Sequence, residues 1–142
     1  MAVCTFFGHR DCPETVRQRL KSVLVELITN NNVTTFYVGN QGQFDAYVRN
    51  ELQKIQQEYP QINYAVVLAY MPCKEIDYAD RSNTLLPEGI EDAPPRYAIS
   101  WRNNWMLKQA DYVVAYVTHS WGGAAQYTKK AEKQGKTVIN LG

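Results

Sequence analysis

Short apolar runs alternate with amphipathic segments along most of the chain, and this order limits the possible folds more than any other feature. The apolar runs have the length of strands and are rich in β-branched and aromatic residues. They cover residues 3–7, 34–38, 64–68, 112–117 and 137–141. Strands that are apolar along their whole length are usually covered on both faces, as in a parallel sheet. We therefore predict an α/β fold, a Rossmann-like three-layer domain with a mostly parallel sheet of five strands or slightly more.

Helical patterns fill the intervals between these strands. Apolar residues recur every three or four positions from Val16 to Leu27, after a proline, Pro13, that suits the first turn of a helix. A second helix follows the second strand and ends before Pro60. Two further helices are expected at about 96–109 and 123–134. The first two of these helices each have one apolar face with which to cover the sheet.

Residues 70–95 interrupt the alternation, because they show no convincing period and contain four prolines. A loop of this length is uncommon in a compact domain and is usually functional or disordered. Apolar side chains such as Tyr78 and Leu86 favour a lid or an oligomer contact over plain disorder. The length of 142 residues is typical of one domain. We expect a single domain over 1–142, with a lid or interface loop at about 70–95.

Charge and cysteine content narrow the class of protein. The 15 basic and 14 acidic residues nearly cancel, whereas proteins that bind the DNA backbone usually show a basic excess. The three cysteines lie far apart with no metal-ligand spacing, so we predict reduced thiols, no metal and no cofactor. No signal peptide or membrane-length apolar run is visible. We expect a cytoplasmic protein without membrane contact, and a homo-oligomer because Tyr and Trp are abundant.

Three glycine-containing motifs stand directly after the first, second and fourth predicted strands, where ligands bind in open α/β sheets. Their candidate ligand-binding residues are Gly8, His9 and Arg10; Gly39, Asn40, Gln41, Gly42 and Asp45; and Thr118, His119, Ser120, Trp121, Gly122 and Gly123. Glycine frees backbone amides for an anion, and a helix N-terminus adds its positive dipole end. An arginine fork suits phosphate. Each motif could instead be a structural turn, with Asp45 simply complementing the helix dipole.

Aromatic residues gather at the start of the predicted third helix, beside Arg102. Tyr97, Trp101 and Trp105 are candidates for stacking on a nucleobase, and Arg102 is a candidate for an anionic group. Aromatic residues on helices more often belong to the core, and that alternative stays open here.

Taken together, the segments 6–11, 37–45 and 119–126 resemble the SLOG superfamily, the Rossmann-like group that includes DNA-processing protein A and the Lonely-guy cytokinin-activating enzymes. The whole chain looks like a small stand-alone branch of firmicute bacteria and their phages. The resemblance implies binding of nucleotides or NAD-derived molecules. Superfamily members include sensor domains for cyclic ADP-ribose-type signals of antiphage defence.

One departure from the enzymes of this superfamily affects the predicted activity. Arg102 and Met106 match one Lonely-guy motif, and Gly122 and Gly123 match the diglycine of the other, but Lys129 stands where those enzymes have a catalytic glutamate. A lysine cannot supply that carboxylate. The resemblance thus implies a retained phosphate loop without the catalytic group.

We therefore expect non-catalytic binding of a nucleotide-derived ligand, either an NAD or ADP-ribose derivative or a cyclic nucleotide. The protein would act as a sensor or as a sponge that withdraws a second messenger, including in phage anti-defence. One alternative is a nucleotide N-glycosidase (phosphoribohydrolase-like) that uses Arg102 with Asp45, Glu88 or Asp92 as replacement acid. A second alternative is single-stranded DNA binding, although the charge balance speaks against a nucleic-acid partner.

Overall fold

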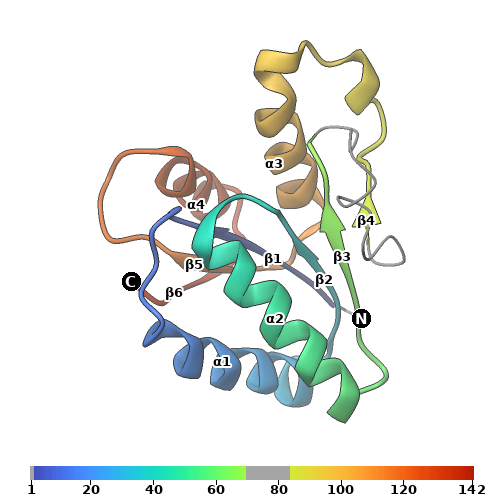
Figure 1. Cartoon of the computed structure of the whole chain (residues 1–142), viewed down its shortest axis with the longest axis vertical. Coiled ribbons are helices and arrows are strands. Elements are labelled where there is room, and N and C mark those ends of the chain that lie inside the picture. The colour runs from blue at the N-terminus through green and yellow to red at the C-terminus, as the bar shows by residue number, and fades with distance from the viewer. Residues whose placement is uncertain (1, 70–83) are drawn as a thin grey trace.

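The computed structural model of the chain describes residues 2–69 and 84–142, which form a sheet between two layers of helices (Figure 1). Its strands are β1 (Ala2–Gly8), β2 (Val33–Val38), β3 (Asn63–Val67), β4 (Thr84–Leu85), β5 (Tyr112–Tyr116) and β6 (Thr137–Asn140). They form one six-stranded sheet in the order β4-β3-β2-β1-β5-β6, and each neighbouring pair is parallel. The predicted fold class is therefore confirmed.

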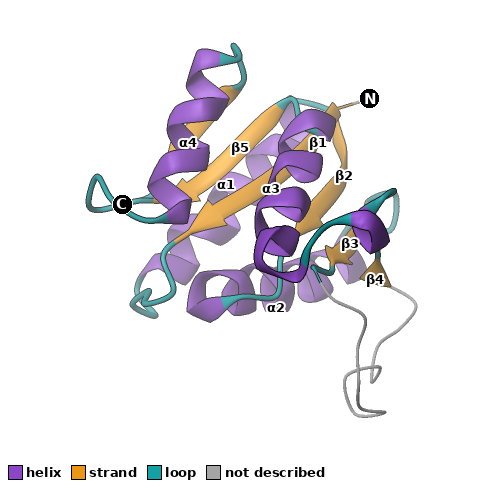
Figure 2. Cartoon of the chain, turned by 90° about the horizontal axis from the view of Figure 1, so that it is seen from above, coloured by secondary structure: helices purple, strands orange, loops and turns teal. Residues whose placement is uncertain are grey.

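Helices cover both faces of the sheet, as Figure 2 shows. Helices α1 (Val16–Asn30) and α2 (Gly42–Glu58) pack on one face, and α3 (Ala98–Gln109) and α4 (Gly123–Lys133) pack on the other. Val16, Leu20 and Leu27 of the apolar face predicted for α1 are buried, and Leu24 is buried beside them. Within residues 2–69 and 84–142, every helix falls short of the apolar length that a bilayer crossing requires.

The larger of the two cores lies under α1 and α2. Phe36 of β2 is completely buried there and stacks on Phe6 of β1, with ring centroids 6.2 Å apart. A smaller core lies under α3 and α4, where Met106 and Leu107 pack with Phe7. Successive residues of β1, Phe6 and Phe7, thus enter opposite cores, because side chains alternate between the faces of a strand. This explains why β1 is apolar along most of its length.

Part of the segment for which a long loop was predicted is regular structure. Thr84 and Leu85 form β4 by pairing with Val66 and Val67, and this makes β4 the edge strand beside β3. Two short 3-10 helices, Ile90–Asp92 and Pro95–Tyr97, lead into α3. A two-residue strand carries too little sequence to show a period, which is why no strand was predicted here. The predicted lid or interface role of 70–95 falls largely on residues 70–83, outside the described part of the chain.

The strand order reverses between β1 and β5. From β1 the chain adds β2, β3 and β4 on one side, and it then returns to place β5 and β6 on the other side. The helices after β1 and β5 therefore diverge onto opposite faces, and the carboxyl ends of these two strands border a crevice. Two of the three predicted motifs, which begin at Gly8 and Thr118, stand at this reversal.

Close packing between β1 and α2 generates a first prediction. A methyl group at Gly8 would lie 2.1–2.7 Å from carbon atoms of Phe44, which is fully buried. We expect Gly8→Ala to lower the free energy of unfolding by about 1–3 kcal/mol, as overpacking of a core does. Equilibrium unfolding in urea measures this change. Gly123→Ala is the matched control, because a methyl group there would have no heavy atom within 4 Å. Equal stability of Gly8→Ala and the wild type would contradict the packing described.

Candidate ligand-binding site

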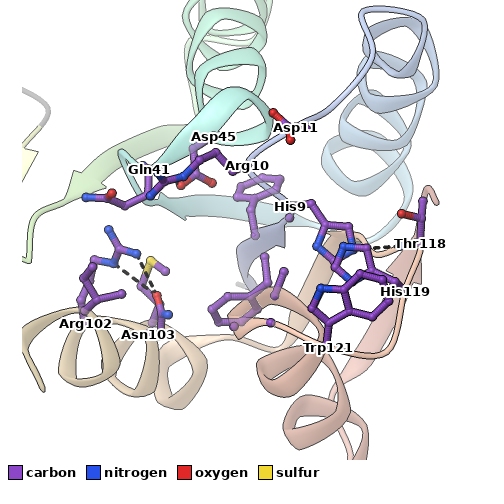
Figure 3. A pocket seen from close by; sticks show the side chains of 18 residues that line it. His9, Arg10, Asp11, Gln41, Asp45, Arg102, Asn103, Thr118, His119 and Trp121 are labelled. Carbon is purple, nitrogen blue, oxygen red and sulfur yellow. Dashed lines mark hydrogen bonds between the residues drawn. The ribbon is translucent and has the colours of Figure 1, made fainter.

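A cavity of about 560 Å³ opens at the carboxyl ends of β1 and β5 (Figure 3). Its volume is typical of sites for small molecules and cofactors. Many of the predicted site residues meet in its wall. These are Gly8, His9, Arg10, Gln41, Asp45, Arg102, Thr118, His119, Trp121, Gly122 and Gly123. The wall does not include Gly39, Asn40, Gly42, Ser120, Tyr97, Trp101 or Trp105.

His9 joins the loops that follow β1 and β5. Its backbone amide donates to the carbonyl of Tyr116 (3.1 Å), which continues the β1–β5 ladder. The backbone amide of Thr118 donates to Nε2 of His9 (3.0 Å), so the proton of the neutral ring lies on Nδ1. Partial burial lowers the pKa of His9, and neighbouring His119 lowers it further. His9 thus acts here as a neutral hydrogen-bond acceptor that positions the loop before α4.

The aromatic rings of His9, His119 and Trp121 form a column in the cavity wall. The His9 and His119 centroids lie 3.7 Å apart with 12° between the ring planes. His119 and Trp121 are likewise 3.7 Å apart, at 19°. Nδ1 of His119 is buried without a hydrogen-bond partner among the described residues.

The N-terminus of α4 is open toward the cavity. Gly122 has a φ of 94°, a left-handed conformation that favours glycine, and its carbonyl accepts the helical bond from the amide of Gln126. The amides of Gly123, Ala124 and Ala125 precede that bond and so have no partner within the helix. Among the described residues, no side-chain hydrogen bond caps this end. Gly123 and Ala124 line the cavity, and a Cβ atom at Gly123 would meet open space. This helix end can therefore receive an anion.

The loop after β2 is arranged differently from the loop before α4. The amide of Gln41 donates to Oδ2 of Asp45 (3.0 Å), and the amide of Gln43 donates to the carbonyl of Arg10 (2.7 Å). A Cβ atom at Gly39 would lie 2.8 Å from Oδ2 of Asp45, so this glycine makes room for the carboxylate. The amides of Gln41 and Gln43 thus already have hydrogen-bond partners within the protein. The absence of a side chain at Gly39 leaves room for the Asp45 carboxylate.

Arg102 and Asp45 form a buried polar wall on the side of the cavity opposite the ring column (Figure 3). Nε and Nη2 of Arg102 donate to Oδ1 of Asn103 (3.2 and 3.0 Å), and Nη1 donates to Oδ1 of Asn40 (3.3 Å). Asp45 is only 7% exposed. Burial raises its pKa to about 6, although the amide of Gln41 and the charges of Arg102 and Arg49 oppose the increase.

Arg10 is the more accessible of the two cavity arginines. It is exposed, and its side chain forms no hydrogen bond or ion pair with the residues that the structure describes. Its guanidinium group is therefore available to an anionic ligand, whereas that of Arg102 already holds two side chains in place.

The stripe of α3 that faces the cavity was predicted only in part. Ile99, Arg102, Asn103 and Met106 line the cavity at helical spacing, and of these only Arg102 was predicted as a ligand-binding residue. Tyr97, Trp101 and Trp105 follow a different stripe. Nε1 of Trp101 donates to the carbonyl of Glu88 (3.2 Å), and Trp105 packs edge-on against Tyr37. Asn103 lies three residues before Met106, and this spacing places the two on the same face of the helix.

The described residues offer neither a metal cluster nor a reactive thiol. No group of three His, Cys, Asp or Glu side chains among them could hold a metal ion. Burial raises the pKa of Cys12 to about 11 and also raises the pKa of Cys4, so both thiols stay protonated at neutral pH. Cys73 lies outside the described residues.

Asp45 generates a prediction about stability and pH. Its folded-state pKa of about 6 lies above the ordinary value of 3.8, so the folded protein binds its proton more tightly than the unfolded chain does. The contribution of this group to stability therefore decreases as the pH rises from about 4 to about 6. Relative to Asp45→Asn, we expect the wild type to lose about 2 kcal/mol over that interval. Urea unfolding of both proteins across this pH range measures the difference. A constant difference would contradict the raised pKa.

Comparisons with known proteins identify the fold. No family model and no curated protein matches the sequence. Among solved structures, DNA processing protein A from Streptococcus pneumoniae matches with a TM-score of 0.71 and 14% identity, over 99% of this chain and 50% of that one. DNA processing protein A from Helicobacter pylori, described for its single-stranded DNA binding mode, matches with a TM-score of 0.68 and 14% identity, over 98% and 64%. The chain thus spans only half to two thirds of the length of these proteins. Over nearly its whole length, it shares the Rossmann-like fold of the matched part of DNA processing protein A, at low sequence identity.

Proposed function

We propose that the chain binds a nucleotide-derived ligand in the cavity between β1 and β5, without catalysing a reaction on it. The observation that carries this proposal is the uncapped N-terminus of α4, which opens into a cavity of about 560 Å³. Free amides at a helix N-terminus and an exposed arginine, Arg10, favour a phosphate group. The cavity is also much larger than a phosphate ion needs, and aromatic side chains form part of its wall. These features favour a phosphate attached to a larger, partly planar molecule.

We infer the absence of catalysis because the chain lacks the catalytic carboxylate of the Lonely-guy enzymes that it resembles. Lys129 stands at that position, is exposed on α4 and does not line the cavity. A protein that retains affinity without turnover can act as a sponge for a second messenger, or as a sensor that passes the signal to a partner. Ligands of the ADP-ribose and cyclic nucleotide classes are therefore the first to test.

Single-stranded DNA, which the Helicobacter pylori protein binds according to its description, is the competing ligand. The formal net charge of this chain is only +1, and two carboxylates, Asp11 and Asp45, line the cavity. Neither feature favours a long polyanion.

Calorimetry with ADP-ribose, cyclic ADP-ribose isomers, adenosine monophosphate, cyclic nucleotides and a short single-stranded oligonucleotide tests the proposal. We expect at least one small nucleotide to bind with a Kd below about 100 μM, equivalent to roughly −5.5 kcal/mol. Weaker binding of every small nucleotide, or binding of the oligonucleotide alone, would contradict it.

Two variants locate the bound ligand. Gly123→Val should abolish binding because its side chain would fill the space beside the α4 amides, yet it should fold normally because no protein atom occupies that space. Arg10→Ala should weaken binding by about 1.5–3 kcal/mol, the contribution of a lost charge-assisted hydrogen bond. Lys129→Ala, on the same helix but outside the cavity, is the control. Unchanged affinity in both Gly123→Val and Arg10→Ala would place the ligand elsewhere.

Asp45 supports a second candidate function, a nucleotide N-glycosidase. A buried carboxyl with a pKa of about 6 in a cavity wall has the properties of a general acid. Glu88 and Asp92, the other carboxylates considered for this role, do not line the cavity. Incubation with nucleoside monophosphates and chromatography for free base distinguishes the two functions. We expect no base to be released. Release that Asp45→Asn abolishes would establish the enzyme instead.

A further inference from the structure

Trp121 presents an unoccupied aromatic face at the cavity. Its indole stacks on the His119 ring at 3.7 Å, so one face is covered at van der Waals distance. The residue is nevertheless 69% exposed, the highest value among the large hydrophobic residues in the described segments. A tryptophan with one face in full contact can reach this exposure only if its opposite face is open. Because Trp121 also lines the cavity, a planar group bound there can reach that face.

The column that carries Trp121 is anchored to the sheet. His9, at its inner end, accepts a hydrogen bond from the backbone of Thr118 and contacts Tyr116 edge-on, with centroids 6.0 Å apart. His119 lies between His9 and Trp121, with nearly parallel planes on both sides. The indole is therefore held at a defined position by residues from the ends of both β1 and β5. A platform fixed before binding costs less conformational entropy when a ligand stacks on it.

We propose that the outer face of Trp121 is the stacking platform for the base of the ligand, and that the same nucleotide places its phosphate on the amides of Gly123 and Ala124. Trp121 and Gly123 are two residues apart, so their Cα atoms are separated by at most about 7.6 Å. One sugar bridges a base and its 5′-phosphate over a comparable length. The assignment names the ligand class as a nucleotide with an aromatic base, and it rests on the proposed function.

This assignment differs from the stacking role that the sequence suggested for Tyr97, Trp101 and Trp105. Those residues, of which Tyr97 ends the 3-10 helix before α3 and the two tryptophans belong to α3, do not line the cavity. Trp121 was predicted only as a member of the phosphate loop. Its role as a platform depends on its stacking with His119, which no sequence pattern shows.

A comparison of ligands with and without a base tests the platform. Calorimetry is done with adenosine monophosphate and with ribose 5-phosphate, which has the same sugar and phosphate but no base. We expect the wild type to bind adenosine monophosphate between about fivefold and about 150-fold more tightly, as base–aromatic stacking provides. Trp121→Ala should remove this preference and leave the affinity for ribose 5-phosphate unchanged, whereas Trp121→Phe should keep part of it. Trp101→Ala, at an exposed tryptophan outside the cavity, should retain the full preference.

The outcomes separate this inference from the proposed function. Equal affinity of the wild type for the two ligands, or a preference that survives in Trp121→Ala, would overturn the platform while leaving a phosphate site intact. A Trp121→Ala variant that loses both ligands to the same extent, with an unchanged unfolding curve, would also overturn it. If neither adenosine monophosphate nor ribose 5-phosphate binds to the wild type, the result contradicts both the stacking role of Trp121 and the proposed binding of such nucleotides in the cavity.

Discussion

The parallel pairing of β1 with β5 is the contact on which the candidate site depends. Five residue pairs, from Cys4 with Tyr112 to Gly8 with Tyr116, bring together strands that are distant in sequence. The connections from these strands then diverge to opposite faces of the sheet, which leaves space above their carboxyl ends. The bond from the amide of Thr118 to His9 continues the contact beyond the strands. Ligand-binding groups from two loops can therefore meet only because this pairing forms.

The two walls of the cavity differ in how their polar groups are satisfied. On the Arg102 side, the guanidinium group donates to the side-chain amides of Asn103 and Asn40, and the Asp45 carboxylate accepts from the amide of Gln41. At the α4 side, the first amides of the helix have no capping side chain, and Arg10 is exposed. A bound anion would gain most at the open side, because the groups there need not break bonds within the protein. The closed side can supply shape and orientation to the rest of the ligand.

The fold could be predicted from the sequence because each strand and helix has its own hydrophobic pattern, and these patterns alternate along the chain. Apolar strands and periodic helices show it directly, and among the described strands only β4, which is defined by its pairing with β3, escaped prediction. The site could be predicted in part, since glycines after strands mark the edge where ligands bind. What the sequence could not show is which face of α3 is turned inward. That orientation brings Asn103 into the cavity and leaves Trp101 outside it. The sequence also does not show that Trp121 stacks on His119 at the cavity wall.

The central claim is that the N-terminus of α4 receives the phosphate of the ligand. Backbone amide NMR shifts, followed during a titration with adenosine monophosphate, test it most directly. The account predicts the largest shifts at Gly123 and Ala124, with a smaller change at Gln41, whose amide is already bonded to Asp45. Shifts centred on the loop after β2, with the amides of Gly123 and Ala124 unmoved, would contradict it.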